Sequence, residues 1–266
     1  MRAEEALRAI ASQQPLVHHL TNYVTVNLVA NTTLSTGALP VMAHAHEEVE
    51  EMVGLASALV VNIGTLDPNF VEAVLLAGRR ANELGIPVIL DPVGAGATSF
   101  RTSTAERLLS ELDIAAVCGN AGEIATLAGL AAEVRGVESL AGDALEATRK
   151  AANSIGATVA ATGETDYVSD GERTLAVSNG HPLMGRVVGS GCASTAVVGC
   201  FAAVGGPGIE TVAHALAYFG RAGEAASGEA DGDGTFQPRF LDALAQITAD
   251  PTGLEGVLRV EEVSGG

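Results

Sequence analysis

Two glycines one residue apart, Gly189 and Gly191, stand directly before Cys192 and a segment of small residues that predicts a helix over 193–204. Glycine lets the backbone turn tightly, so that several N–H groups face one point, and the N-terminus of a helix adds partial positive charge. The run therefore predicts an anion-binding turn at Gly189, Gly191 and Cys192. An ordinary glycine turn before a buried helix is the alternative, and an isolated pair of glycines would favour it.

Polar side chains follow two of the predicted strands. Asp91 comes directly after a strand at 87–90, and Asn120 and Glu123 follow a strand that ends at Cys118. Because ligands bind beyond the carboxyl ends of strands in open α/β sheets, we expect both carboxylates at the edge that holds the glycine turn. Two carboxylates and an amide suit a hydrated Mg²⁺ that bridges nucleotide phosphates. Each alone has a structural alternative, a turn residue before proline for Asp91 and a charge in the first helical turn for Glu123.

The chemistry that such a site supports is phosphoryl transfer, in which positioning and charge neutralisation dominate. A base beside the substrate alcohol would also take its proton. Cys192 is the candidate, because a thiol at a helix N-terminus has a lowered pKa and is partly thiolate. A buried, inert cysteine that assists only by its position is the competing interpretation.

Short apolar runs alternate with longer amphipathic segments along the chain. Buried strands are predicted at 16–20, 58–63, 87–90, 114–118 and 158–161. Helices are predicted at 23–34, 68–84, 104–111, 121–128 and 143–155, with Asp67 as the N-cap and Pro68 in the first turn of the second. This alternation predicts an α/β fold, in which βαβ units form a mainly parallel central sheet flanked by helices.

The remaining segments complete this prediction. Residues 167–169 and 173–178 predict a hairpin at one edge of the sheet. Residues 189–247 read as helical with a break at 228–234. Because no repeat, low-complexity tract or linker interrupts the sequence, we expect a single domain over residues 1–266.

Composition limits the classes of function. The 14 Lys and Arg against 32 Asp and Glu give a net charge of −18, which repels nucleic acid and anionic membranes. No apolar run reaches the ~20 residues needed to cross a bilayer. The N-terminus does not resemble a signal or transit peptide, so a cytoplasmic protein is expected. Lys150 is the only lysine and no Gly-x-x-x-x-Gly-Lys-Ser/Thr motif is present, which excludes a P-loop.

The three cysteines are expected to be free thiols. Their odd number and the lack of a Cys-x-x-Cys spacing argue against a disulfide scaffold or a structural zinc site. Cys192 and Cys200 would lie about 12 Å apart along one helix, too far to be bridged. His44 and His46 are interpreted as part of a loop before a helix at 47–52, and not as a metal site.

Five segments together closely resemble the hydroxyethylthiazole kinase family. They are PLVHHLTNYVTVNLVANTTLSTGALPVM at 15–42, LDPVGAGA at 90–97, GNAGE at 119–123, TGETDY at 162–167 and VVGSGCAST at 187–195. Their order and spacing match the family from about residue 5 to residue 248. The resemblance implies a ribokinase-like fold. It also implies ATP-dependent phosphorylation of the alcohol of 4-methyl-5-(2-hydroxyethyl)thiazole in thiamine salvage.

The resemblance assigns residues to the cofactors. It implies that Asp91 and Glu123 hold Mg²⁺, mostly through water, and that Asn120 and Thr162 lie at the ATP. It further implies a homotrimer whose active sites lie at subunit interfaces.

The substrate side of the site is also assigned by resemblance. It implies a thiazole pocket at Asn22, Val24 and Met42, with Gly189 near the hydroxyethyl end. An apolar valine and a pliable methionine suit a small flat heterocycle, with an amide or backbone group for its ring nitrogen. Met42 is more often a core residue than a ligand, so its assignment depends on the resemblance.

One position departs from the family, which usually has an arginine that contacts ATP immediately before Gly-Asn. Here that position is Cys118, and a neutral thiol cannot replace the charge of a guanidinium. Either another cation substitutes, Arg186 being the candidate, or nucleotide affinity is weakened. The departure favours one alternative function, a nucleotide- or thiazole-binding protein that has lost catalysis. Another small-alcohol kinase of the same fold, such as one for hydroxymethylpyrimidine, is the second alternative, and the segment 22–42 argues against it.

Overall fold

The structure, a computed structural model, describes residues 1–130 and 140–263. Within these residues nine strands form one sheet, in the order β2-β1-β3-β4-β5-β6-β7-β8-β9. The strands are β1 (Leu16–Leu20), β2 (Leu39–Val41), β3 (Ala58–Asn62), β4 (Val88–Asp91), β5 (Ala116–Asn120), β6 (Thr158–Thr162), β7 (Asp166–Ser169), β8 (Thr174–Val177) and β9 (Val260–Glu262). The five pairings from β2 to β6 are parallel and the three from β6 to β9 are antiparallel. The predicted α/β class with a mainly parallel sheet is confirmed.

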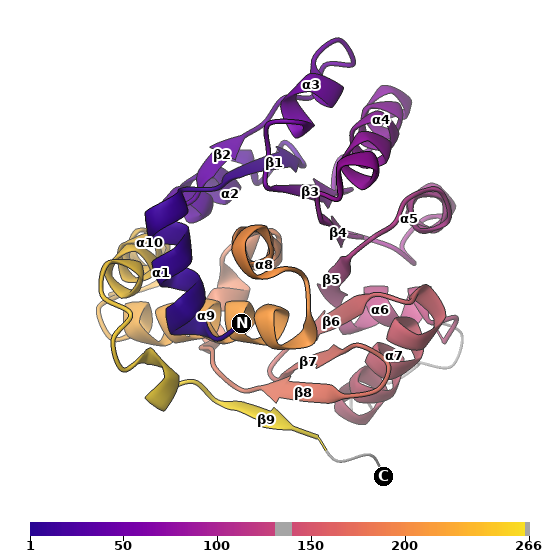
Figure 1. The fold of residues 1–266 in the computed structure, drawn as a ribbon. Coiled ribbons are helices and arrows are strands. Elements are labelled where there is room, and N and C mark those ends of the chain that lie inside the picture. Colours follow the sequence, from indigo (N-terminus) through magenta and orange to yellow (C-terminus); the bar gives the residue numbers. More distant parts are fainter. Residues whose placement is uncertain (131–139, 264–266) are drawn as a thin grey trace.

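Helices cover both faces of the sheet (Figure 1). One face carries α1 (Ala3–Gln13), α2 (Val26–Ser35), α8 (Ser190–Gly205), α9 (Ile209–Ser227) and α10 (Asp233–Ala249). The other carries α3 (Val49–Val53), α4 (Pro68–Leu84), α5 (Ser99–Glu111), α6 (Ala121–Leu127) and α7 (Leu140–Ile155). Two short 3₁₀ helices, η1 (Pro182–Arg186) and η2 (Leu254–Gly256), precede α8 and β9. Within the described ranges, every helix is too short or too polar to cross a bilayer.

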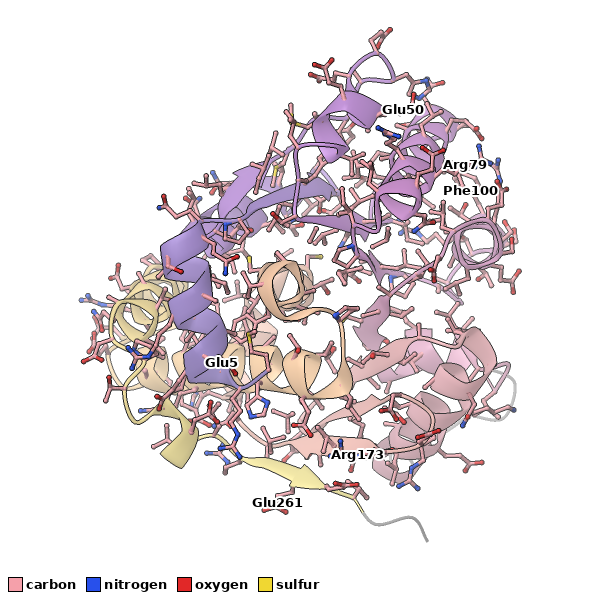
Figure 2. The ribbon with its side chains drawn as sticks, viewed as in Figure 1. Glu5, Glu50, Arg79, Phe100, Arg173 and Glu261 are labelled. Carbon is pink, nitrogen blue, oxygen red and sulfur yellow. The ribbon has the colours of Figure 1, made fainter. Side chains whose placement is uncertain are left out.

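Side-chain alternation along the strands separates the core into two apolar clusters. In β3, Val60 belongs to the cluster that includes residues of α8, whereas Leu59 and Val61 belong to the cluster on the opposite face. Asn62 has the same parity as Val60, so its side chain faces α8. The charged side chains labelled in Figure 2, such as Glu5, Glu50 and Arg173, lie on the outside of the molecule.

The helix α8 packs closely on the centre of the sheet. A Cβ atom at Gly199 would lie 2.3 Å from Cγ2 of Val60 in β3, so the absence of a side chain at position 199 permits this contact. Every residue from Ala193 to Ala202 is buried, which agrees with the small-residue composition of the helix. The position of the N-terminus of α8 therefore depends on this close approach.

Helix boundaries follow local capping. The predicted helix 68–84 is confirmed as α4, since Oδ1 of Asp67 accepts hydrogen bonds from the backbone N–H groups of Asn69 and Phe70. Helix α2 begins at Val26 and not at residue 23, because Asn22 to Thr25 form a turn in which Asn22 Oδ1 accepts from the N–H of Thr25. Helix α5 begins at Ser99, five residues before the predicted start, because Thr98 caps it.

The structure differs from the prediction in three further respects. The hairpin of β7 and β8 is confirmed, but it is not at the edge, because β9 pairs with β8 beyond it. The short strands β2 and β9 were not predicted, since three residues carry too little pattern. The helical region 189–247 has a second break at 206–208, where Gly206 adopts a φ of 71°.

Candidate active site

Three polar residues of the predicted site are the last residues of adjacent parallel strands. Asp91 ends β4, Asn120 ends β5 and Thr162 ends β6. In the sheet register, Asn120 is paired with Thr162, and Asp91 is paired with Asn62 at the end of β3. Strand β5 therefore ends two residues later than predicted, and this shift brings Asn120 to the edge of the sheet.

A cavity of about 200 Å³ lies at this edge. Eight of its lining residues were predicted as site residues: Asp91, Cys118, Asn120, Glu123, Thr162, Gly189, Gly191 and Cys192. Val93, Gly119, Ser194 and Thr195 complete the lining. The glycine turn and both carboxylates thus share one cavity.

The glycine turn forms the wall that belongs to α8. Gly189 is the N-cap of the helix and has a φ of 89°, and a Cβ atom there would lie 2.3 Å from Cγ2 of Thr25. Only glycine meets both conditions. No described side chain caps the helix, and the hydroxyls of Ser194 and Thr195 both donate to the carbonyl of Gly191. The N–H of Ser190 donates to the carbonyl of Val187, so the N–H groups of Gly191 and Cys192 are the ones left for a bound anion.

Asp91 is a buried carboxyl group that faces α8. Its Oδ2 accepts a hydrogen bond of 2.6 Å from Nδ2 of Asn62. Burial, and then the nearby negative charge of Glu123, raise the pKa of Asp91 to about 8. Hydrogen bonds from Asn62, Thr195 and Cys192 oppose this rise. A group that binds between the two carboxylates must be positively charged to be stabilised by them.

Glu123 has a structural role at the start of α6. Its Oε2 accepts from the N–H of Asn120 at 2.8 Å, and Asn120 Oδ1 accepts from the N–H of Glu123 at 3.0 Å, which completes a capping box. Its Oε1 accepts from the N–H of Gly94 at 2.7 Å. Both alternatives for Glu123 therefore have a basis, since the capping carboxylate also lines the cavity.

Cys192 occupies the third position of α8 and lines the cavity. The predicted lowering of its pKa is wrong. Burial and the carboxylate of Asp91 raise the pKa of the thiol, and hydrogen bonds from Thr25, Asn62 and Asn22 oppose the rise only in part. At neutral pH the thiol is protonated in this environment.

Of the predicted thiazole residues, Gly189 lines this cavity, whereas Asn22, Val24 and Met42 do not. Val24 is 70% exposed, Met42 is half-buried, and neither lines it. Asn22 is buried, and its side-chain amide donates to Asn62 at 2.8 Å and to the Cys192 sulfur at 3.5 Å. Asn22 therefore reaches the site through Cys192 and does not present its amide to the cavity.

Sequence reasoning missed Asn62. It lies within the predicted strand 58–63, and the only signal was a polar residue at the end of a valine-rich run. Such a residue needs hydrogen-bond partners in the core. Arg101 was also missed, because its helix was predicted to begin later. Its guanidinium donates to the carbonyls of Ile63, Gly64 and Val93, so it ties the loop after β3 to the loop after β4.

No cation takes the place of the family arginine at Cys118 in the described cavity lining. Cys118 is 1% exposed, and burial together with Asp91 and Asp166 raises the pKa of its thiol. Arg186, the predicted substitute, forms an exposed ion pair with Asp233. Lys150 lies on α7 and is exposed.

Two other features do not contribute to the site. His44 and His46 lie in the loop before α3, where they bond to backbone atoms of Met42 and Asn69, respectively. The described residues contain no group of three His, Cys, Asp or Glu side chains placed to hold a metal ion. A larger cavity of about 510 Å³, beside Arg149 and Arg173, is lined by none of the predicted site residues, so we do not place the site there despite its size.

Known proteins resemble this chain over nearly all of its length. The sequence model described as the Hydroxyethylthiazole kinase family matches residues 7–250. A hydroxyethylthiazole kinase of Rubrobacter xylanophilus is 71% identical over 267 residues, covering 100% of both chains.

Solved structures show the same relationship. The hydroxyethylthiazole kinase protein of Pyrococcus horikoshii OT3 superposes with a TM-score of 0.90 at 45% identity, covering 98% of each chain. A ribokinase-like superfamily protein of Enterococcus faecalis superposes with a TM-score of 0.61 at 15% identity, covering 88% of this chain and 86% of that one. The second likeness shows the fold alone, and the expected ribokinase-like architecture is confirmed.

Proposed function

The chain belongs to the hydroxyethylthiazole kinase family, and from this premise we propose how its residues carry out the reaction. The activity is phosphorylation of the alcohol of 4-methyl-5-(2-hydroxyethyl)thiazole in thiamine salvage, with ATP as the co-substrate. The enzyme is a phosphotransferase with a small alcohol as acceptor.

The observation that carries the proposal is the shared cavity of the glycine turn and the two carboxylates. The uncapped N–H groups of Gly191 and Cys192 would receive the transferred phosphoryl group, because donors fixed in place stabilise developing negative charge without reorganisation. Asn120 and Thr162, at the ends of β5 and β6, would contact the nucleotide from the opposite wall.

Asp91 and Glu123 are the residues that would hold Mg²⁺. Their mutual repulsion, which contributes to the raised pKa of Asp91, fits a site that is completed by a cation. Two carboxylates without a third protein ligand suit an ion that keeps several waters and binds substrate phosphates. An ion held by these two residues would supply positive charge that neutralises the phosphates.

Cys192 would lie next to the substrate hydroxyl. The raised pKa keeps the thiol of Cys192 protonated. We therefore propose that the main role of Cys192 is to position the substrate hydroxyl, and that accepting the proton of this hydroxyl is a secondary role. The hydrogen bond from Asn22 holds the sulfur at the mouth of the turn.

The thiazole ring would lie against Asn22, Val24 and Met42 in a homotrimer whose active sites lie at subunit interfaces. The exposure of Val24 in the single chain supports this arrangement, since a partner subunit would cover it. Tyr23, which precedes Val24, and Val188, which precedes Gly189, are also large exposed side chains.

The location, the excluded partners, the number of domains and the alternative functions are also part of the proposal. We propose a cytoplasmic location, and the net charge of −18 supports an enzyme that binds neither nucleic acid nor anionic membranes. The single nine-stranded sheet supports one kinase domain over residues 1–266. A hydroxymethylpyrimidine kinase is disfavoured by the family match, and a chain that has lost catalysis is favoured only by the cysteine at position 118.

A coupled assay of ADP release tests the proposal. We expect ADP release to require both hydroxyethylthiazole and Mg²⁺. The variant Asp91→Asn removes the carboxylate while keeping the shape of the side chain, so it should release less ADP than the wild type. Equal turnover with hydroxymethylpyrimidine, or turnover undiminished by a chelator, would contradict it. Binding of the thiazole without any ADP release would favour the inactive binding protein.

A further inference from the structure

A continuous chain of hydrogen bonds runs through the interior from Cys192 to Asp91. Asn22 Nδ2 donates to Sγ of Cys192 at 3.5 Å and to Oδ1 of Asn62 at 2.8 Å. Asn62 Nδ2 then donates to Oδ2 of Asp91 at 2.6 Å. Asn22, Asn62 and Asp91 are each at most 4% exposed, so water does not compete for these bonds.

We propose that Asn62 is a positioning residue that holds the carboxylate of Asp91 and, through Asn22, the thiol of Cys192 in a fixed relation. The catalytic role of Asn62 rests on the proposed function. The hydrogen bonds themselves do not depend on that function.

The orientation of both amides is set by backbone donors. The N–H of Gly64 donates to Oδ1 of Asn62 at 3.0 Å, and the N–H of Thr25 donates to Oδ1 of Asn22 at 3.1 Å. A backbone N–H can only donate, so the oxygen of each amide must face it and the nitrogen must face the site. Reversing either amide would place its NH₂ group against a backbone N–H, so that two donors would face each other, which is costly.

The chain joins four separate parts of the fold. Asn22 follows β1, Asn62 ends β3, Asp91 ends β4 and Cys192 lies in α8. Asn62 and Asp91 are register partners, so the donor of one and the acceptor of the other meet at the same level of the sheet. The residue at position 62 is thus the junction through which the sheet edge orients groups on both walls of the cavity.

Only an amide at position 62 makes every bond observed there. Asparagine supplies an acceptor for Gly64 and Asn22 and a donor for Asp91. Aspartate fills the same space and keeps the acceptor for Asn22 and Gly64, but it exchanges the NH₂ donor for a second carboxyl group beside Asp91, and alanine loses both the donor and the acceptor. Asn62→Asp therefore alters the arm to Asp91 and keeps the arm to Asn22, whereas Asn62→Ala removes both arms.

Steady-state kinetics and thermal unfolding of these two variants test the proposal. We expect each to lower kcat about ten- to a hundredfold, the usual factor for one hydrogen bond to a charged group, with KM for the thiazole alcohol within about threefold of wild type. Asn179→Ala is the matched control, because Asn179 is similarly buried and bonded, but its partners, which include backbone atoms of Val257 and Arg259, do not include Asp91 or Asn22. It should lower the melting temperature and leave kcat unchanged.

A second measurement, which needs no catalytic turnover, tests the arm from Asn62 through Asn22 to Cys192. Alkylation of Cys192 by iodoacetamide in the free protein can be measured by mass spectrometry, with the buried Cys118 and Cys200 as internal references. Asn62→Ala and Asn22→Ala should shift the Cys192 rate in the same direction and by a similar factor, and Asn179→Ala should not shift it.

The outcomes separate the inference from the proposed function. If wild-type protein shows no thiazole-dependent ADP release, the function fails, while the alkylation pattern still decides whether Asn62 supports the thiol. If both Asn62 variants keep kcat within about twofold of wild type, or if Asn179→Ala matches their loss, the inference is overturned. An alkylation rate that Asn62→Ala leaves unchanged overturns it as well.

Discussion

At the scale of single residues, the thiol of Cys192 lies between groups that act on its pKa in opposite directions. Burial and Asp91 raise the pKa, whereas hydrogen bonds from Asn22 and Asn62 stabilise the thiolate. The same donors would stabilise an aspartate carboxylate, which ionises at lower pH than a thiol. We expect Cys192→Asp to keep or raise turnover, and Cys192→Ala to lower kcat more than KM for the thiazole, both measured by steady-state kinetics.

The control for these variants lies in the same helix. Cys200 is buried about two turns further along α8 and does not line the cavity, so Cys200→Ala should leave the kinetics unchanged. An aspartate variant that melts like the wild type but has no activity would mean that the geometry assigned to Gly191-Cys192 is wrong.

Cys118 stands where the family usually has an arginine. Its side chain is in the core but lines the cavity, and the carboxylates of Asp91 and Asp166 lie near enough to raise its pKa. A guanidinium there would have carboxylate partners and space along the cavity. We expect Cys118→Arg to lower KM for ATP about ten- to a hundredfold, from roughly 1.5–3 kcal/mol for a charge-assisted hydrogen bond, with KM for the thiazole nearly unchanged.

Cys200→Arg is the matched comparison, because Cys200 is fully buried, lines neither of the two cavities described above and should not tolerate a charge. Unfolding of both arginine variants would mean that Cys118 is an ordinary core residue. A Cys118→Arg variant that folds with an unchanged KM for ATP would mean that another group already serves the nucleotide.

The sequence predicts the residue types of the site better than their contacts. The two carboxylates, the glycine turn and the strand-end residues were found from spacing, because strand ends and helix starts share one edge of an α/β sheet. The raised pKa of Cys192 was not predictable, since it depends on burial and on Asp91, which is distant in sequence. Asn62 was missed for the same reason, because its role exists only through partners on other elements.

At the scale of elements, the length of a helix or strand decides whether its residue pattern is long enough to predict it. The 17-residue helix α4 and the five-residue strand β1 have the predicted bounds, since each carries a full pattern or a cap. The three-residue strands β2 and β9 exist because neighbouring strands present open edges, which no local pattern encodes. The break between α8 and α9 was missed because apolar residues continue on both sides of it.

The turn that begins α8 gives the prediction at this scale. Gly189→Ala would place a side chain at a φ of 89° and within 2.3 Å of Thr25, and the left-handed backbone alone costs roughly 1–2 kcal/mol. We expect a lower free energy of unfolding and a lower kcat, measured by urea unfolding and by the coupled assay.

Gly185→Ala in η1 is the control, since a Cβ atom there meets nothing within 4 Å. If Gly189→Ala matched this control in both stability and rate, the turn would not depend on the conformation described.

At the scale of the whole molecule, two adjacent buried histidines connect stability to pH. His19 is fully buried, and burial together with His18 lowers its pKa from 6.5 to about 3, so the folded protein keeps it neutral. Below pH 6.5 the unfolded chain binds a proton that the folded protein does not, and stability is lost as the pH falls toward 3. We expect the His19 contribution to fall by about 1.4 kcal/mol per pH unit in that window.

Comparison with a His19→Gln variant isolates this contribution. Asp91 acts in the opposite sense, because its raised pKa favours the folded state when the carboxyl is protonated, so the slope of the wild type alone is a sum. Urea unfolding between pH 4.5 and 7.5 should give a smaller dependence on acid for the variant than for the wild type. Parallel stability curves would contradict the prediction.

The contact between Gly199 and Val60 has a consequence for the evolution of the family. A side chain at position 199 would occupy the space of Cγ2 at position 60, so the two positions cannot drift independently. A lineage that gains a methyl group at position 199 must first have lost one at position 60. If the gain at position 199 came first, the helix that carries the glycine turn would have to shift. Homologous sequences should therefore show paired volume changes at these positions, and frequent independent variation would refute that coupling.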